Sequence, residues 1–168
     1  MKSVFAAAVS LALFTHAFSA SADDRLVRFD GGIGVIPVSS GQGTAATATV
    51  VNRNIVRGVQ PPGQLWVISS LKADVRTDGS IRVDGRGLLL AGGNTIGTNA
   101  NQSVRATLIC DNVAAPQLFD SQLVPLEPNG DFRIDDVLTP AVPAVCASPV
   151  LLIRNPAGAW FAAGIVRE

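Results

Sequence analysis

Residues 73–83 read Ala-Asp-Val-Arg-Thr-Asp-Gly-Ser-Ile-Arg-Val, and they predict a β-hairpin. Apolar and polar residues alternate on both sides of Thr77-Asp78-Gly79, as in two strands that bury one face. A three-residue loop with Gly79 in the left-handed conformation pairs Val75 with Ile81, Ala73 with Val83, and Asp74 with Arg82. A two-residue turn at Asp78-Gly79 would instead place Val75 opposite Arg82 and mix the two faces, so the three-residue loop is the better prediction.

Short strands separated by turn residues fill the rest of the chain. The 16 Gly and 10 Pro break up runs rich in Val, Ile, Leu and Thr, and no run keeps a helical period over ten residues. Val104–Cys110 alternates and places Cys110 on the apolar face, while 150–166 predicts a second hairpin around Asn155-Pro156-Ala157-Gly158. Roughly nine such strands predict an all-β fold, a single antiparallel β-sandwich, with a partly open β-barrel as the alternative.

The first 22 residues predict a secretory signal peptide. Met1-Lys2 gives a positive start, Val4–Phe14 is apolar, and Ala20-Ser21-Ala22 supplies the small residues of a cleavage site before Asp23. The apolar run is shorter than the roughly 20 residues of a membrane-spanning helix. We therefore expect cleavage between Ala22 and Asp23, a single all-β domain over 23–168, no membrane span after cleavage, and a secreted or periplasmic location.

Two cysteines, Cys110 and Cys146, predict one disulfide in an exported chain. The bridge would link the proline-rich stretch Pro140–Pro149 covalently to the core. The alternative is that both cysteines are free thiols. The spacing differs from a redox-active Cys-x-x-Cys pair. Two thiolates without histidine also fall short of the four ligands of a structural zinc site.

The predicted mature chain lacks the side chains of the commonest catalytic mechanisms. The only histidine, His16, lies in the signal peptide, and there is no tyrosine. Ser–His–Asp and Cys–His catalysis are thereby excluded, and Lys72 is the only lysine left for Schiff-base chemistry. Twelve basic residues against 13 acids leave a net charge near −1, which gives no field for collecting nucleic acid. The sequence predicts no enzyme, no cofactor and no nucleic-acid partner.

Three aspartates in 129–136, Asp131, Asp135 and Asp136, lie close in sequence to Asn129 and could supply oxygen ligands to a hard cation such as calcium. Their spacing differs from that of an EF-hand loop, and solvated turn carboxylates are the simpler interpretation. Paired carboxylates could also serve glycoside hydrolysis, but nothing in the sequence places two acids in one cleft.

Other features have a structural interpretation beside a functional one. Trp66 and Trp160 could stack on sugar rings, but each falls in a predicted strand and favours core packing. The glycines of 31–34 and 92–93 lack the Lys-Ser or Lys-Thr of a phosphate loop and favour turns. Eleven arginines, among them Arg76, Arg82 and Arg105, alternate with apolar residues and are predicted to lie on solvent faces. Asn101-Gln102-Ser103 is a glycosylation sequon.

These observations predict an exported, non-catalytic β-sandwich module of the cell envelope or extracellular space, with a binding or structural role. Its partner would be a protein or glycan, and the loops Ala91–Ser103 (uncharged and expected to be mobile) and Pro140–Pro149 are the predicted contact regions. Two alternatives stay open. One is a secreted hydrolase that uses Asp and Glu carboxylates without histidine, and the other is a self-assembling surface subunit, which would be a homo-oligomer.

Overall fold

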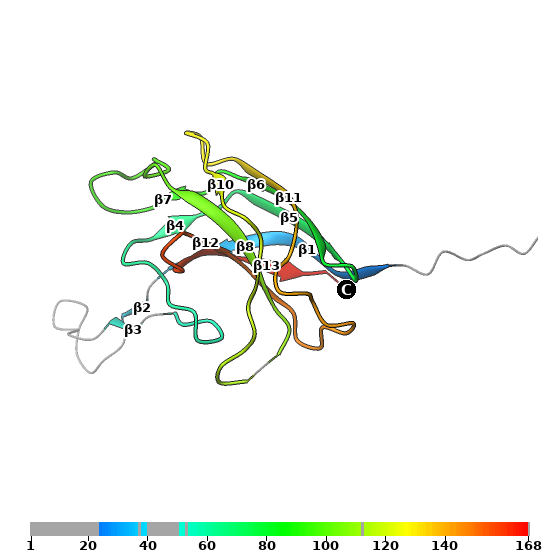
Figure 1. Ribbon diagram of the computed structural model, residues 1–168. Coiled ribbons are helices and arrows are strands. Elements are labelled where there is room, and N and C mark those ends of the chain that lie inside the picture. The colour runs from blue at the N-terminus through cyan, green and yellow to red at the C-terminus, as the bar shows by residue number, and fades with distance from the viewer. Residues whose placement is uncertain (1–23, 37, 40–50, 53, 112, 168) are drawn as a thin grey trace, which may run out of the picture.

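In the computed structural model, residues 24–36, 38–39, 51–52, 54–111 and 113–167 are described, and every regular element among them is a β-strand (Figure 1). The all-β prediction is confirmed. The predicted signal peptide and the cleavage point at Ala22 and Asp23 lie outside the described residues. Within the described part of the chain, no helix has the length and apolar character needed to cross a membrane.

Nine strands form one curled antiparallel sheet. Eight of them follow the order β10-β8-β12-β13-β1-β5-β6-β11, and β9 pairs with β8. Their bounds are β1 Arg25–Gly34, β5 Ser70–Arg76, β6 Ser80–Arg86, β8 Ser103–Ile109, β9 Phe119–Asp120, β10 Val124–Pro125, β11 Phe132–Val137, β12 Val150–Arg154 and β13 Trp160–Val166. The sheet curls until its two ends, β10 and β11, come into contact, so it is a half-barrel of the partly open kind.

Two short pairs of strands accompany the large sheet. β2 (Val38–Ser39) pairs with β3 (Val51–Asn52), and β4 (Trp66–Val67) pairs with β7 (Leu89–Leu90). The second pair closes over the large sheet, because Trp66 stacks on Phe161 of β13 with ring centroids 3.9 Å apart and planes 10° from parallel. This stacking buries both rings in the core.

The predicted hairpin of residues 73–83 is confirmed in its register. β5 and β6 pair Val75 with Ile81, Ala73 with Val83, and Asp74 with Arg82. Gly79 has φ 85° and donates its N–H to the carbonyl of Arg76 at 3.0 Å. The left-handed glycine therefore closes the three-residue loop, and it keeps the apolar residues on one face.

The second predicted hairpin is also confirmed, since β12 and β13 are antiparallel neighbours joined by residues 155–159. The Asn155 side chain accepts the Ala159 N–H at 2.8 Å, and the Asn155 carbonyl accepts the Gly158 N–H at 3.0 Å. These bonds satisfy the backbone of the turn, as asparagine commonly does at its first position.

β1 joins the two halves of the sheet, because it pairs with β5 along its first half and with β13 along its second half. A bulge at Gly31 and Gly32 shifts the register between these halves, with Gly31 at φ 104°. The glycines, predicted as a turn, instead sit inside one bent strand. Both are therefore part of the sheet and leave no phosphate loop at 31–34.

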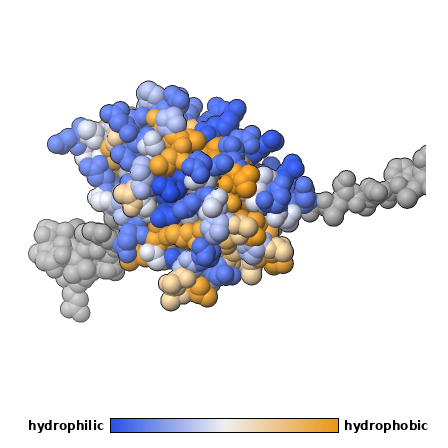
Figure 2. All heavy atoms as spheres, in the orientation of Figure 1, coloured by the Kyte–Doolittle hydropathy of each residue, from blue (hydrophilic) through white to orange (hydrophobic). Residues whose placement is uncertain are grey.

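The core fills the inside of the curl. Phe29, Leu71, Val75, Leu108 and Leu151 are fully buried there. β8 and β12 are covered on both faces, since four consecutive residues of β8 and three of β12 are buried. Figure 2 shows hydrophilic residues along the upper rim of the view, near β6 and β11, and hydrophobic patches lower down.

Candidate functional site

The face turned away from the core on β1, β5, β6 and β11 carries an alternating array of charges. One row across the strands is Arg28, Asp74, Arg82 and Asp135, and the next row is Asp30, Lys72, Asp84 and Arg133. Every neighbour in a row, and every second residue along each strand, has the opposite charge. We call these eight residues the charged face. Opposite charges across strands stabilise a sheet, whereas like charges there would oppose pairing.

The carboxylates of the charged face are held by arginines. Arg25 Nε lies 2.7 Å from Asp74 Oδ2, and Arg167 Nη1 lies 2.7 Å from Asp30 Oδ2. Arg133 Nη2 lies 3.0 Å from Asp84 Oδ2, and Arg82 Nε lies 3.3 Å from Asp135 Oδ2. The hydrogen bond from Arg133, with a further contribution from Arg86, lowers the pKa of Asp84 below its ordinary value. Each aspartate therefore already has a cationic partner.

Two cations of the charged face have no such partner. Among the described residues, neither Arg28 nor Lys72 makes an ion pair or a side-chain hydrogen bond, and both are exposed. Arg28 lies opposite Asp74, and Lys72 lies between Asp30 and Asp84. Because Arg25, Arg167 and Arg133 hold these three carboxylates, Arg28 and Lys72 keep their charges available to a ligand.

An open hollow of about 540 Å³ lies over this part of the face. Its charged lining is Arg25, Arg28, Lys72, Arg82, Arg133, Asp74, Asp84 and Asp135, an excess of two positive charges. A second hollow of about 310 Å³ shares Arg25, Asp74 and Arg82 with the first and adds Arg76. The two hollows thus form one cationic depression on a chain that is close to neutral overall.

The sequence contains a signal for this face that the strand-by-strand prediction missed. Each of the four strands carries one basic and one acidic residue two positions apart, and the pairs are Arg28 and Asp30, Lys72 and Asp74, Arg82 and Asp84, and Arg133 and Asp135. Residues two apart on a strand share a face. The loops predicted as contact regions, Ala91–Ser103 and Pro140–Pro149, do not line this depression.

A second polar cluster lies between β8, β9 and β12. Asp120 Oδ1 accepts a hydrogen bond from Thr107 Oγ1 at 2.5 Å and from Arg154 Nη1 at 3.3 Å, and Asp120 Oδ2 lies 3.7 Å from Arg105 Nη1. We call these four residues the Asp120 cluster. Arg154 also donates its Nε–H to the Gly158 carbonyl at 2.9 Å. Burial lowers the pKa of Arg154 from its ordinary value, although the charge of Asp120 acts in the opposite direction.

The Asp120 cluster corrects the prediction for Arg105. Its side chain is only 27% exposed, and its Nε is buried without a hydrogen-bond partner among the described residues. Thr107, on the same face of β8, is fully buried. The solvent-face prediction assumed that β8 is covered on one side only, whereas the fold covers both sides. For Arg76 and Arg82 the prediction is confirmed, since both are exposed.

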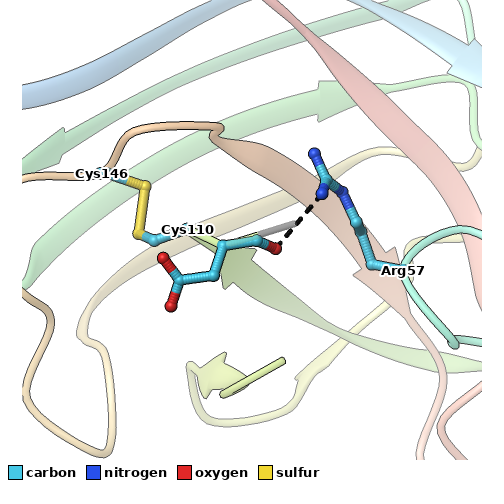
Figure 3. The surroundings of a disulfide bond; sticks show 4 residues. Arg57, Cys110 and Cys146 are labelled. Atoms are coloured by element: carbon cyan, nitrogen blue, oxygen red, sulfur yellow. Dashed lines mark hydrogen bonds between the residues drawn. A yellow bond between two sulfur atoms is a disulfide. The ribbon is translucent and has the colours of Figure 1, made fainter. Parts of the chain in front are cut away.

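The predicted disulfide joins Cys110 and Cys146, with Cα atoms 4.6 Å apart (Figure 3). Cys110 is 1% exposed, at the inner end of β8. Beside the bridge, the Ser148 N–H donates to the Cys110 carbonyl at 3.0 Å, and Arg57 Nη1 donates to the Asp111 carbonyl at 3.3 Å. The proline-rich stretch is therefore fixed to the core, as the sequence predicts, and the described residues contain no free cysteine.

The aspartates proposed for a cation do not converge on one point. Asp131 accepts the Gly87 N–H at 3.0 Å, and Asp136 accepts the Gln122 N–H at 2.6 Å. Asp135 pairs with Arg82. Within the described part of the chain no group of three Asp, Glu, Cys or His side chains is placed to hold a metal ion. These carboxylates organise turns and ion pairs.

The tryptophans and the sequon occupy different environments. Trp66 is 3% and Trp160 is 2% exposed, and Trp160 Nε1 donates to the Asn54 carbonyl at 2.9 Å. Core packing is thus the correct interpretation for both rings. Asn101 is exposed in a turn, where its N–H bonds to the Asn99 side chain. The 91–103 loop is built of such hydrogen-bonded turns, and Asn99 Nδ2 ties it to the Leu126 carbonyl at 2.7 Å.

The sites described above cannot be assigned a function by similarity to known proteins. The charged face, the Asp120 cluster and the disulfide are therefore interpreted from their own chemistry. Comparison of the chain with known protein families, with curated proteins and with solved structures found no match.

Proposed function

We propose that this protein is an exported, non-catalytic binding module and that its binding surface is the charged face. The observation that carries the proposal is the cationic depression over β1, β5, β6 and β11, in which Arg28 and Lys72 keep unpaired charges. Phe29, Ala73 and Val83 also border the depression, but their side chains are buried in the core. The contacts available to a ligand therefore come from the charged side chains.

The state of the carboxylates supports a binding role over hydrolysis. A glycosidase of the common kind needs one carboxyl group that stays protonated to act as general acid, which requires a raised pKa. In the depression, Asp74, Asp84 and Asp135 are each ion-paired with an arginine, and the pKa of Asp84 is lowered. The lowered pKa of Asp84 is the opposite of what a general acid requires, and the three ion pairs suit the ordering of cations around a ligand.

Export is supported by two independent features. Residues 1–22 have the three zones of a signal peptide. The Cys110–Cys146 disulfide is compatible with an oxidising compartment, where such bonds persist. Together they favour a protein that meets its ligand outside the cytosol.

The proposal is tested by capture on matched surfaces. The oxidised chain from Asp23 onward is immobilised beside two variants, Arg82→Gln and Arg57→Gln. Extracts of the host envelope and culture supernatant are passed over all three, and bound species are identified by mass spectrometry. The first variant removes one positive charge from the charged face, and the second removes one positive charge outside the depression.

A species that binds the unmodified chain and the Arg57 variant, but does not bind the Arg82 variant, supports the proposal. Circular dichroism spectra that match the unmodified chain are required of both variants. Empty surfaces, or a species retained equally by all three, would contradict it. Recovery of the protein itself in place of a ligand would favour the self-assembling alternative.

A further inference from the structure

The unpaired cations on the charged face are close enough to act on one ligand. Arg28 lies opposite Asp74 and Lys72 lies opposite Asp30, so Arg28 and Lys72 are diagonal neighbours on β1 and β5. Diagonal positions in antiparallel strands are separated by about 7–8 Å, within the span of long side chains. A ligand with two anionic groups could therefore contact both cations at once.

The shape of the depression favours an extended ligand. The 540 Å³ hollow continues into the 310 Å³ hollow toward Arg76. On its other side, a third hollow of about 410 Å³ shares Asp84 and Arg133 with the first and also contains Arg86, Glu127 and Asp131, so its lining has one net negative charge. The cationic stretch therefore lies between Arg133 and Arg76, across β11, β6, β5 and β1.

The chemistry of this stretch excludes two common modes of recognition. Neutral sugars are usually held by stacking on exposed aromatic rings, but Trp66 and Trp160 are both buried. An extended peptide usually binds by adding a strand at a sheet edge. The backbones of β5 and β6 are instead paired on both sides, within the interior of the sheet. Binding here has to come from side-chain charge.

Resting on the proposed function, we propose that Arg28 and Lys72 form the centre of a site for an acidic polysaccharide, recognised through its repeated carboxylate or sulfate groups. Arg82 and Arg76 extend the site along the cationic stretch. Arg25 and Arg167 act as positioning residues, because they hold Asp74 and Asp30 away from the two central cations. Charge-assisted hydrogen bonds from arginine and lysine are the strong contacts available to such anions.

The test is a titration of the oxidised chain from Asp23 onward with fluorescent oligogalacturonate, with a sulfated oligosaccharide, and with a neutral oligosaccharide of equal length. We expect binding of at least one acidic ligand at low ionic strength that weakens as salt rises, because exposed charges are screened. No binding of either acidic ligand, or equal binding of the neutral one, overturns the inference. Inorganic sulfate that binds as tightly as the oligosaccharide would also overturn it, since the site would then take a free oxyanion.

Single variants identify the residues. Arg28→Gln and Lys72→Gln should each weaken binding about tenfold, the loss expected for one charged hydrogen bond. Arg57→Gln removes the same charge outside the depression and should leave the affinity unchanged. Asp74→Asn should tighten binding severalfold, because it removes a negative charge from between the two cations. A folding defect cannot produce that gain, so equal affinities for the Arg28, Lys72 and Asp74 variants would overturn the inference.

The two proposals can fail separately. Capture of a protein or neutral glycan that depends on Arg82 would support the binding module and overturn the proposal of a polysaccharide ligand. If neither the capture experiment nor the titration detects binding, both proposals are overturned.

Discussion

Asp120 holds together two arginines that would otherwise repel each other. Arg105 and Arg154 are direct cross-strand partners in β8 and β12, and both contact the Asp120 carboxylate. The Arg154 side chain is only 13% exposed, so its charge is poorly solvated. Like charges opposite each other destabilise strand pairing unless a counter-charge lies between them. Asp120 is therefore a stabilising residue of the fold, distinct from the charged face.

Replacement of Asp120 by Asn should lower the free energy of unfolding by about 2 kcal/mol, because it leaves two partly buried cations without a counter-charge. Asp24→Asn is the matched control. Its partner Arg76 lies 3.4 Å away, with side chains 51% and 63% exposed, and such surface pairs contribute about 0–1 kcal/mol. Urea denaturation measures both changes. If the two variants lose the same stability, the Asp120 cluster has no special role.

Asp84 gives a prediction for pH. Its pKa lies below the ordinary 3.8, chiefly because Arg133 donates a hydrogen bond to the ionised form. The stabilisation is therefore present above the ordinary pKa and is lost as the pH falls through the lower, folded-state pKa. In NMR titrations of the Asp84 carboxyl, Arg133→Gln should raise this pKa toward 3.8. An unchanged pKa in the variant would show that another group causes the shift.

At the scale of the element, the β5–β6 hairpin depends on the conformation of a single residue. Gly79 has φ 85°, and a Cβ at this position would meet no atom closer than 3.7 Å. The cost of a side chain there would come from the backbone alone. Because the loop fixes the register, the same residue also decides that Asp74 and Arg82 share the outer face.

Gly79→Ala should lower the free energy of unfolding by about 1–2 kcal/mol, the cost of a left-handed conformation for an L-residue with a side chain. Gly63→Ala is the control, because Gly63 has open space around its Cα and no positive φ. The midpoint of urea unfolding should fall for the Gly79 variant and stay the same or rise for the Gly63 variant. A register determined by side-chain pairing alone would leave both midpoints similar.

At the scale of the whole molecule, the disulfide joins segments 36 residues apart and fixes an irregular stretch to the end of β8. Between the two cysteines the chain runs through β9, β10 and β11, so the loop it closes includes both ends of the curled sheet. A link of this kind restricts the unfolded chain more than it adds contacts to the folded one.

The double variant Cys110→Ala and Cys146→Ala should lose about 4 kcal/mol of unfolding free energy on the loop-entropy estimate. Reduction should lower the thermal midpoint of the unmodified chain to about that of the double variant. The midpoint of the variant should not change on reduction. This comparison separates the bridge from the packing of Cys110. A reductant effect that persists in the variant would contradict the assignment.

Features that depend only on residues close together in the chain could be predicted from the sequence. Period-two alternation and turn glycines predicted the β5–β6 register, the β12–β13 hairpin and the all-β class, because each is decided within about ten residues. An even number of cysteines in a chain with a predicted signal peptide predicted the Cys110–Cys146 bridge. The same local patterns predicted that Trp66 and Trp160 belong to the core. These predictions needed no knowledge of which strands lie side by side.

The tertiary structure alone decided the order of the strands and therefore the sites. β1 lies beside β5 and β11 lies beside β6, across separations of more than 40 residues, and only this order assembles four separate charge pairs into the charged face. The Asp120 cluster likewise draws on β8, β9 and β12. Alternation along a strand shows which face a residue takes. It cannot show which strand lies next or whether a second layer covers that face, because long-range packing of the core decides both.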